Sequence, residues 1–123
     1  MIHNCETYAA LGNGFDERND CAVRATALAL CLDYSVVHKA FLKHERKPRH
    51  RSLLFITCRV IHEFANVFLT REPRTLLAQF VKDHSVGHYI VHVRGHLFAL
   101  CDGVVFDWTL VERRRVLGYW KVA

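Results

Sequence analysis

Three residue types that take part in nucleophilic catalysis follow one another along this chain. Cys21 opens the alanine-rich stretch CAVRATALALCLD, His96 begins the apolar run HLFAL, and Asp107 lies near the end of the next run, VVFDW. A thiol attacks a carbonyl carbon as the thiolate, and an imidazole can take the thiol proton when a carboxylate fixes the tautomer of its ring. The three residues therefore predict thiol-based acyl chemistry, provided that the fold brings them together.

The position of Cys21 favours an ionised thiol. Asn19 or Asp20 is a suitable N-cap, so we expect a helix that starts at Cys21 and ends near Leu32. The unpaired N–H groups and the positive dipole end of its first turn would stabilise a thiolate and hold a developing oxyanion. A negative charge on Asp20 opposes this effect, so its side chain is expected to point away from the sulfur.

A tight turn predicts that His96 and Asp107 meet. Asp102-Gly103 is a strong turn signal between two strand-like runs. With this turn, His96 and Asp107 lie on the same face of the hairpin and diagonal to each other, within reach of a polar contact. If the turn shifts by one residue, Asp102 would support His96 instead.

Each of the three residues also has a purely structural interpretation. Free cysteine is among the most buried residue types, so Cys21 could fill space in a helix. His96 could be an ordinary strand residue, and Asp107 could bind a backbone group near Trp108. Their order, their elements and their common face together favour the catalytic interpretation. We interpret the remaining four cysteines as structural residues: Cys5, Cys31, Cys58 and Cys101.

Two stretches, NDCAVRATALAL and GHLFALCDGVVFDW, resemble the papain-like cysteine hydrolases. The similarity is to their minimal forms, the bacteriocin-processing (double-glycine) peptidases and small phage-encoded relatives, and it covers residues 15–108. The resemblance implies that Cys21 is the nucleophile, that His96 is base and acid, and that Asp107 orients His96. It also implies a peptide or isopeptide bond in a peptide or protein substrate as the target, with no cofactor.

The sequence departs from this family at the oxyanion hole. Papain-like peptidases place a glutamine a few residues before the cysteine, and Phe15 stands at that position here. Asn19 is the nearest side-chain amide that could take this supporting role. The same Cys-His-Asp arrangement serves deamidation and acyl transfer as well as peptide hydrolysis, so the reaction within this class stays open.

The order of the elements predicts an α+β protein with helices first and an antiparallel meander after them. Residues 53–66 fit a helix better than a strand, although LLFIT alone suits a strand. Ser35 is the expected cap of the second helix, and Leu76, Leu77, Phe80 and Val81 are expected to face inward. The expected helices span 21–32, 36–44, 53–66 and Pro73 to 84, and the expected strands span 88–93, 96–100, 104–108 and, at the edge, 115–123. The resemblance implies a papain-like domain over residues 1–123, with N-terminal helices packed on a C-terminal antiparallel sheet.

Basic residues gather in HERKPRHRS (44–52) and ERRR (112–115), and the net charge is +5. We expect solvated loops here, in which Arg46, Lys47, Arg49 and Arg51 are the candidate contacts for an acidic partner. The alternative function is thus a non-catalytic basic binding module, such as a phage effector, that engages an acidic protein surface or nucleic acid. The clusters lack interleaved aromatic residues for base stacking.

Several classes of protein are not expected from the composition. The five cysteines are odd in number and lack a CxxC pair, which argues against a disulfide framework or a zinc ribbon and for a reducing, cytoplasmic setting. No apolar run is long enough to span a bilayer, and no secretory signal is visible. Glycines and strand-forming residues interrupt the histidine series 84, 88, 92 and 96, so no metal site is expected.

Overall fold

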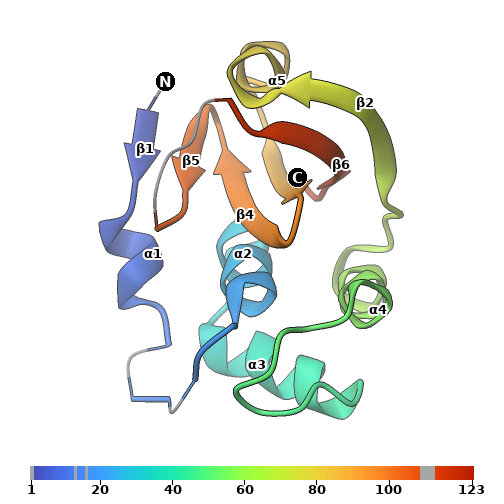
Figure 1. Cartoon of the computed structure of the whole chain (residues 1–123). Helices are drawn as coiled ribbons and strands as arrows, with labels where there is room; N and C mark the ends of the chain where they lie inside the picture. The colour runs from blue at the N-terminus through green and yellow to red at the C-terminus, as the bar shows by residue number, and fades with distance from the viewer. Residues whose placement is uncertain (1, 13, 16, 109–112) are drawn as a thin grey trace.

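The structure, a computed structural model, describes residues 2–12, 14–15, 17–108 and 113–123 (Figure 1). Asn13, Asp16 and, from the second basic cluster, Glu112 lie outside these residues. The described residues contain five helices and a six-stranded mixed sheet, so the α+β class is confirmed.

The sheet has the strand order β1-β5-β4-β3-β6-β2. Strands β3, β4 and β5 form the predicted meander, and the positive φ angles of Asp102 (48°) and Gly103 (83°) fit a tight hairpin turn between the last two. The strands comprise β1 (Ile2–Asn4), β2 (Thr70–Leu76), β3 (His88–Val93), β4 (His96–Cys101), β5 (Val104–Phe106) and β6 (Arg115–Lys121).

Two expectations about the sheet are wrong. β6 is not an edge strand, because it pairs with β3 on one side and with β2 on the other. The sheet is also neither wholly C-terminal nor wholly antiparallel, because β1 pairs with β5 in the parallel direction. These pairings join segments far apart in the chain, which local sequence patterns do not report.

Three of the predicted helices are confirmed, with small changes at their ends. The described helices are α1 (Glu6–Ala10), α2 (Cys21–Leu30), α3 (Tyr34–Lys43), α4 (Leu54–Ala65) and α5 (Leu77–Asp83). The N-cap position of α3 is Asp33, which places Ser35 inside the helix. Helix α1 was not predicted. α2 ends at Leu30 and not near Leu32 as expected, because Cys31 takes a left-handed conformation.

The expected helix start near Pro73 is wrong. Residues 70–76 form β2, and α5 begins only at Leu77, whose N–H binds the carbonyl of Arg114 on the neighbouring segment. Leu77, Phe80 and Val81 are buried as predicted, whereas Leu76 is 38% exposed. The strand pairing with β6 therefore overrides the helical preference of this segment.

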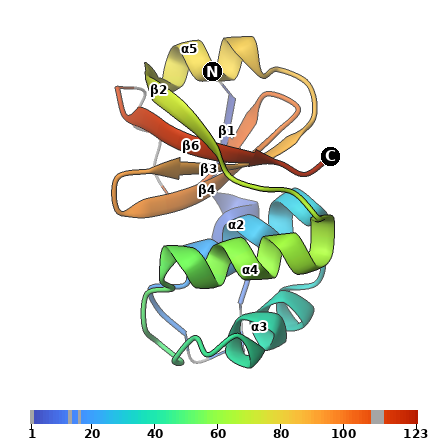
Figure 2. The same cartoon turned by 90° about the vertical axis from the view of Figure 1, so that its right-hand side faces the viewer.

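Helices cover both faces of the sheet (Figure 2). α5 packs on one face over the buried side chains of Val91, Phe98 and Val116. α2, α3 and α4 lie on the other face, where the small side chains of α2 allow it to pack closely against Leu97 and Ala99 of β4. This packing places the N-terminus of α2 beside the first residues of β4.

Candidate active site

The fold brings the three candidate catalytic residues together. Leu100 pairs with Val105, so the hairpin register places Asp107 diagonal to His96, and Nε2 of His96 lies 2.7 Å from Oδ1 of Asp107. The predicted contact of these two side chains is confirmed. Nε2 is thus occupied, which leaves Nδ1 as the ring nitrogen for the thiol of Cys21. Cys21 and His96 line the same two pockets and are close enough for each to shift the pKa of the other.

The carboxylate of Asp107 is held firmly. The residue is only 4% exposed, and its Oδ1 also accepts the backbone N–H of Trp108 at 2.8 Å. Its backbone carbonyl lies 3.0 Å from Nε2 of His3, the central residue of the neighbouring strand β1. A buried carboxylate fixed in this way keeps the His96 ring in one orientation and supports its charged form.

The electrostatics of the site favour a thiolate–imidazolium pair. Burial opposes ionisation of Cys21, but the hydrogen bond and charge of His96, the backbone N–H of Leu97 and the charge of Arg51 together hold the thiol pKa below its ordinary value. Burial also disfavours the charged form of His96, yet Asp107 and Cys21 raise the His96 pKa to about 9. Both shifts favour the ionised pair over the neutral pair.

Asp20 turns its charge away from the thiol, as the prediction required. It is 5% exposed, and both carboxylate oxygens accept Nε–H of Arg24 at 3.1 Å. The hydroxyl of Tyr34 donates to the same carboxylate at 2.7 Å. Asp20 occupies the N-cap position of α2 without a side-chain cap hydrogen bond, so the N–H groups of the first turn stay open toward the site.

Asn19, the expected side-chain support for the oxyanion, lies near Cys21, but its amide already makes a hydrogen bond. Asn19 is exposed, has a positive φ of 57° and donates its side-chain amide to the carbonyl of Arg49 at 3.4 Å. It lines a pocket next to Cys21, so this amide lies near the site but is already shared. Phe15 packs edge-on against Tyr34, with ring centroids 4.9 Å apart, and offers no side-chain donor.

Two pockets open next to Cys21. Both are lined by Cys21, Arg51, Gly95 and His96. The first, of about 140 Å³, continues over apolar groups of α2, α4 and β4, and the second, of about 200 Å³, continues past Asn19 to Trp108. A carbonyl placed at the sulfur can therefore extend its acyl half into one pocket and its leaving group into the other.

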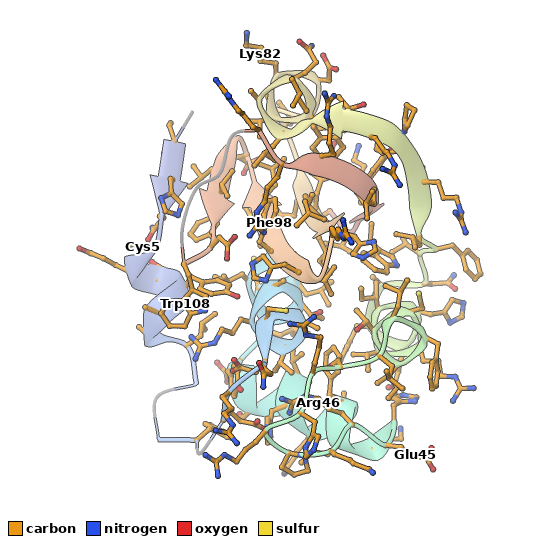
Figure 3. All side chains as sticks on the ribbon, in the orientation of Figure 1. Cys5, Glu45, Arg46, Lys82, Phe98 and Trp108 are labelled. Atoms are coloured by element: carbon orange, nitrogen blue, oxygen red, sulfur yellow. The ribbon has the colours of Figure 1, made fainter. Side chains whose placement is uncertain are left out.

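Sequence reasoning missed an aromatic and cationic layer beside the site. The guanidinium of Arg24 lies 4.9 Å from the ring centroid of Trp108 and 5.5 Å from that of Tyr8. Figure 3 shows Trp108 beside α1, which carries Tyr8, and the two rings meet edge-on at 5.3 Å. The sequence signal that could have revealed this layer is Arg24, a single arginine inside an alanine-rich helix. A buried guanidinium needs hydrogen-bonding or aromatic partners.

The expectation that all four basic side chains of the 44–52 loop are exposed to solvent is wrong at Arg46. Arg46 is 3% exposed and binds Glu17 through two hydrogen bonds, at 2.7 and 3.1 Å, so it is not available to a partner. Although burial opposes it, bonding by Arg46, His38 and the Arg49 backbone lowers the pKa of Glu17 to about 2. Lys47 and the side chain of Arg51 remain at the surface, as predicted for a solvated loop.

The other four cysteines, interpreted from the sequence as structural, fall into an exposed pair and a pair packed against the core, Cys58 and Cys101. Cys5 and Cys31 are exposed, while burial raises the pKa of Cys58 and, with the help of Cys31, raises the pKa of Cys101 to about 12. Cys31 lies 3.8 Å from Nδ1 of His88, but that nitrogen is 2.9 Å from the carbonyl of Ala29. Nδ1 must therefore carry the proton, and it cannot act as a base toward Cys31.

Comparison with family models, curated proteins and solved structures gave no match. No helix in the described part of the chain is both long enough and apolar enough to cross a membrane.

Proposed function

We propose that the protein is a minimal papain-like cysteine hydrolase that acts on a peptide or isopeptide bond. The observation that carries the proposal is the triad geometry. A thiol at a helix N-terminus meets an imidazole whose other nitrogen is held at 2.7 Å by a buried carboxylate. The residue order and element types match the family resemblance of the sequence, and free thiols fit the proposed cytoplasmic setting.

In this mechanism the Cys21 thiolate attacks the carbonyl carbon, and the carbonyl oxygen takes the negative charge. The open N–H groups of the first turn of α2 stabilise that oxyanion. The His96 imidazolium gives its proton to the leaving amine, which departs and leaves an acyl-thioester on Cys21. His96, now neutral, takes a proton from water, and the resulting hydroxide attack releases the carboxylic acid and restores the thiolate.

The test is alkylation of the folded protein by iodoacetamide between about pH 5 and pH 9, mapped by mass spectrometry. We expect selective labelling of Cys21 with an apparent pKa below that of an ordinary thiol, and loss of this selectivity in His96→Ala. Cys31 is an internal control, because it also lies beside a histidine but at the opposite, C-terminal end of α2. Equal alkylation rates of Cys21 and Cys31 would refute the proposal.

A further inference from the structure

A concave basic site lies at the end of the sheet beyond the candidate active site. A cavity of about 660 Å³ is lined by four arginines together with Val93 and Leu117. We call this cavity the arginine pocket, and its arginines are Arg74, Arg94, Arg114 and Arg115. Among the described residues none of the four forms an ion pair, and Nη1 of Arg114 is buried without a hydrogen-bond partner. Four like charges without a counterion in the described part of the chain define a site for an anionic ligand.

Irregular strand pairing turns these side chains toward one cavity. The β3–β6 register shifts between His92 and Val93, which leaves Leu117 as an extra residue on β6. The β2–β6 register shifts between Arg71 and Thr75, and Arg74 within that segment has a positive φ of 55°. Bulges of this kind change the direction of the side chains that they carry.

Neighbouring pockets that share lining residues form a groove between the arginine pocket and the candidate active site. A middle section of about 310 Å³ shares Arg74 and Leu117 with the arginine pocket. The same section shares Leu54 and His92 with the pocket next to Cys21. A ligand that occupies the arginine pocket can therefore extend along this surface to the thiol.

The strand register gives the length of this groove. His96, Val93, Val116 and Thr75 pair in succession across β4, β3, β6 and β2, which lie next to one another in Figure 2. Three strand spacings correspond to roughly 14 Å, and an extended peptide covers about 3.3 Å per residue. Arg74 directly precedes Thr75, so the Arg74 end of the arginine pocket lies about four peptide residues from the thiol, and Val93 and Arg94 line the nearer end.

On the basis of the proposed hydrolase, we infer that its substrate is a peptide segment with Asp or Glu side chains within about four residues of the bond that is cleaved, bound by the arginine pocket. Guanidinium groups pair with carboxylates through two parallel hydrogen bonds, which gives orientation as well as affinity. The described lining contains no aromatic ring on which a nucleic-acid base could stack, and this favours a peptide over single-stranded nucleic acid.

Two measurements on the full chain test the inference. The first is the binding of fluorescein-labelled hexaglutamate, with hexaglutamine and a thymidine oligonucleotide for comparison, followed by fluorescence anisotropy. The second is the rate at which iodoacetamide alkylates Cys21 in the presence of each unlabelled ligand. We expect hexaglutamate to bind, to lose affinity as salt rises and to slow alkylation of Cys21, and hexaglutamine to do none of these.

The key variant carries Arg74→Gln and Arg94→Gln, which alter two exposed side chains that line the pocket. We expect it to bind hexaglutamate about tenfold more weakly, because two charge-assisted contacts are removed. The matched control carries Lys39→Gln and Lys82→Gln, which removes the same charge from exposed positions that do not line the pocket. Its affinity is expected to stay within about twofold of the original protein.

The outcomes separate this inference from the proposed function. Alkylation of Cys21 without protection by hexaglutamate would overturn the inference and leave the hydrolase standing. Binding of hexaglutamate to a protein whose Cys21 is unreactive would overturn the hydrolase but support the acidic-peptide site. Equal binding of hexaglutamine, equal loss in the control variant, or tighter binding of the oligonucleotide would each refute the inference.

Discussion

Replacement of Asp107 by asparagine should change the proton affinity of His96 more than any other single substitution. In the folded protein the carboxylate at 2.7 Å is the main influence that raises the His96 pKa from 6.5 to about 9 against the effect of burial. The asparagine side chain would keep the shape of the aspartate but remove its charge. Burial is then opposed only by Cys21, so we expect the His96 pKa to fall by about two units or more.

The assay is NMR titration of the imidazole nitrogens, with the His96 signals assigned by comparison with His96→Gln. Asp102→Asn is the matched control, because Asp102 belongs to the same hairpin but its carboxylate lies 3.6 Å from His88. The control is expected to leave the His96 titration unchanged. A His96 pKa near 6.5 in the original protein, or a fall caused by Asp102→Asn, would refute the reasoning.

The same shift sets the pH dependence of stability. Because the folded-state pKa of His96 is raised, the stabilisation from Asp107 is fully present below about pH 6.5 and disappears as the pH rises through about 9. The difference in unfolding free energy between the protein and Asp107→Asn should shrink over this range. Urea denaturation at several pH values measures it, and a difference that grows with pH would contradict the assignment.

Three further predictions concern the rest of the fold. Arg46→Met leaves the Glu17 carboxylate buried and without its arginine, so we expect a loss of about 3 kcal/mol in urea unfolding at neutral pH. The contribution of Glu17 is present above pH 4.5 and is lost as the pH falls toward 2, so the effect should vanish in acid. Gly118→Val places a Cβ about 3.0 Å from the Thr70 carbonyl and should cost about 2 kcal/mol or more, measured the same way. Cys101, whose pKa is about 12, should resist iodoacetamide at about pH 8 in the folded protein, as mass spectrometry would show.

Each of these has a clear contrary result. Lys43→Met breaks an exposed ion pair with Glu63 and should lower the unfolding free energy by less than about 1 kcal/mol. An equal loss in Lys43→Met and Arg46→Met would show that burial of the Arg46–Glu17 pair does not matter for stability. Unchanged stability of Gly118→Val would contradict the interior position of β6. Rapid alkylation of Cys101 would show that its burial is incomplete.

The local geometry of the candidate site was predictable because it depends on short-range rules. The alanine-rich stretch forms α2 from Cys21, with Asp20 at the expected N-cap position but without a side-chain cap hydrogen bond. The Asp102-Gly103 turn defines the hairpin register, which in turn places His96 next to Asp107, eleven residues away. Helix propensity and turn chemistry act over a few residues, so the sequence carries them directly.

Other features depended on partners that are distant in the chain. Residues 70–76 have helical and charged character, yet they form β2 because β6 offers a strand to pair with. The basic loop suggested that Arg46 was solvated, but Glu17, 29 residues earlier, draws it into the interior. Neither outcome could be predicted without knowing which segments meet.

By itself, then, the sequence determined the α+β class, the helix that carries Cys21 and the hairpin that joins His96 to Asp107. Only the tertiary structure decided that the thiol lies beside His96, that Asp20 turns toward Arg24, and that a groove leads to the arginine pocket. The physical reason is the distance along the chain over which each interaction acts. Backbone preferences act between neighbours in the chain, whereas strand pairing and the burial of charge are decided by contacts that exist only after the chain has folded.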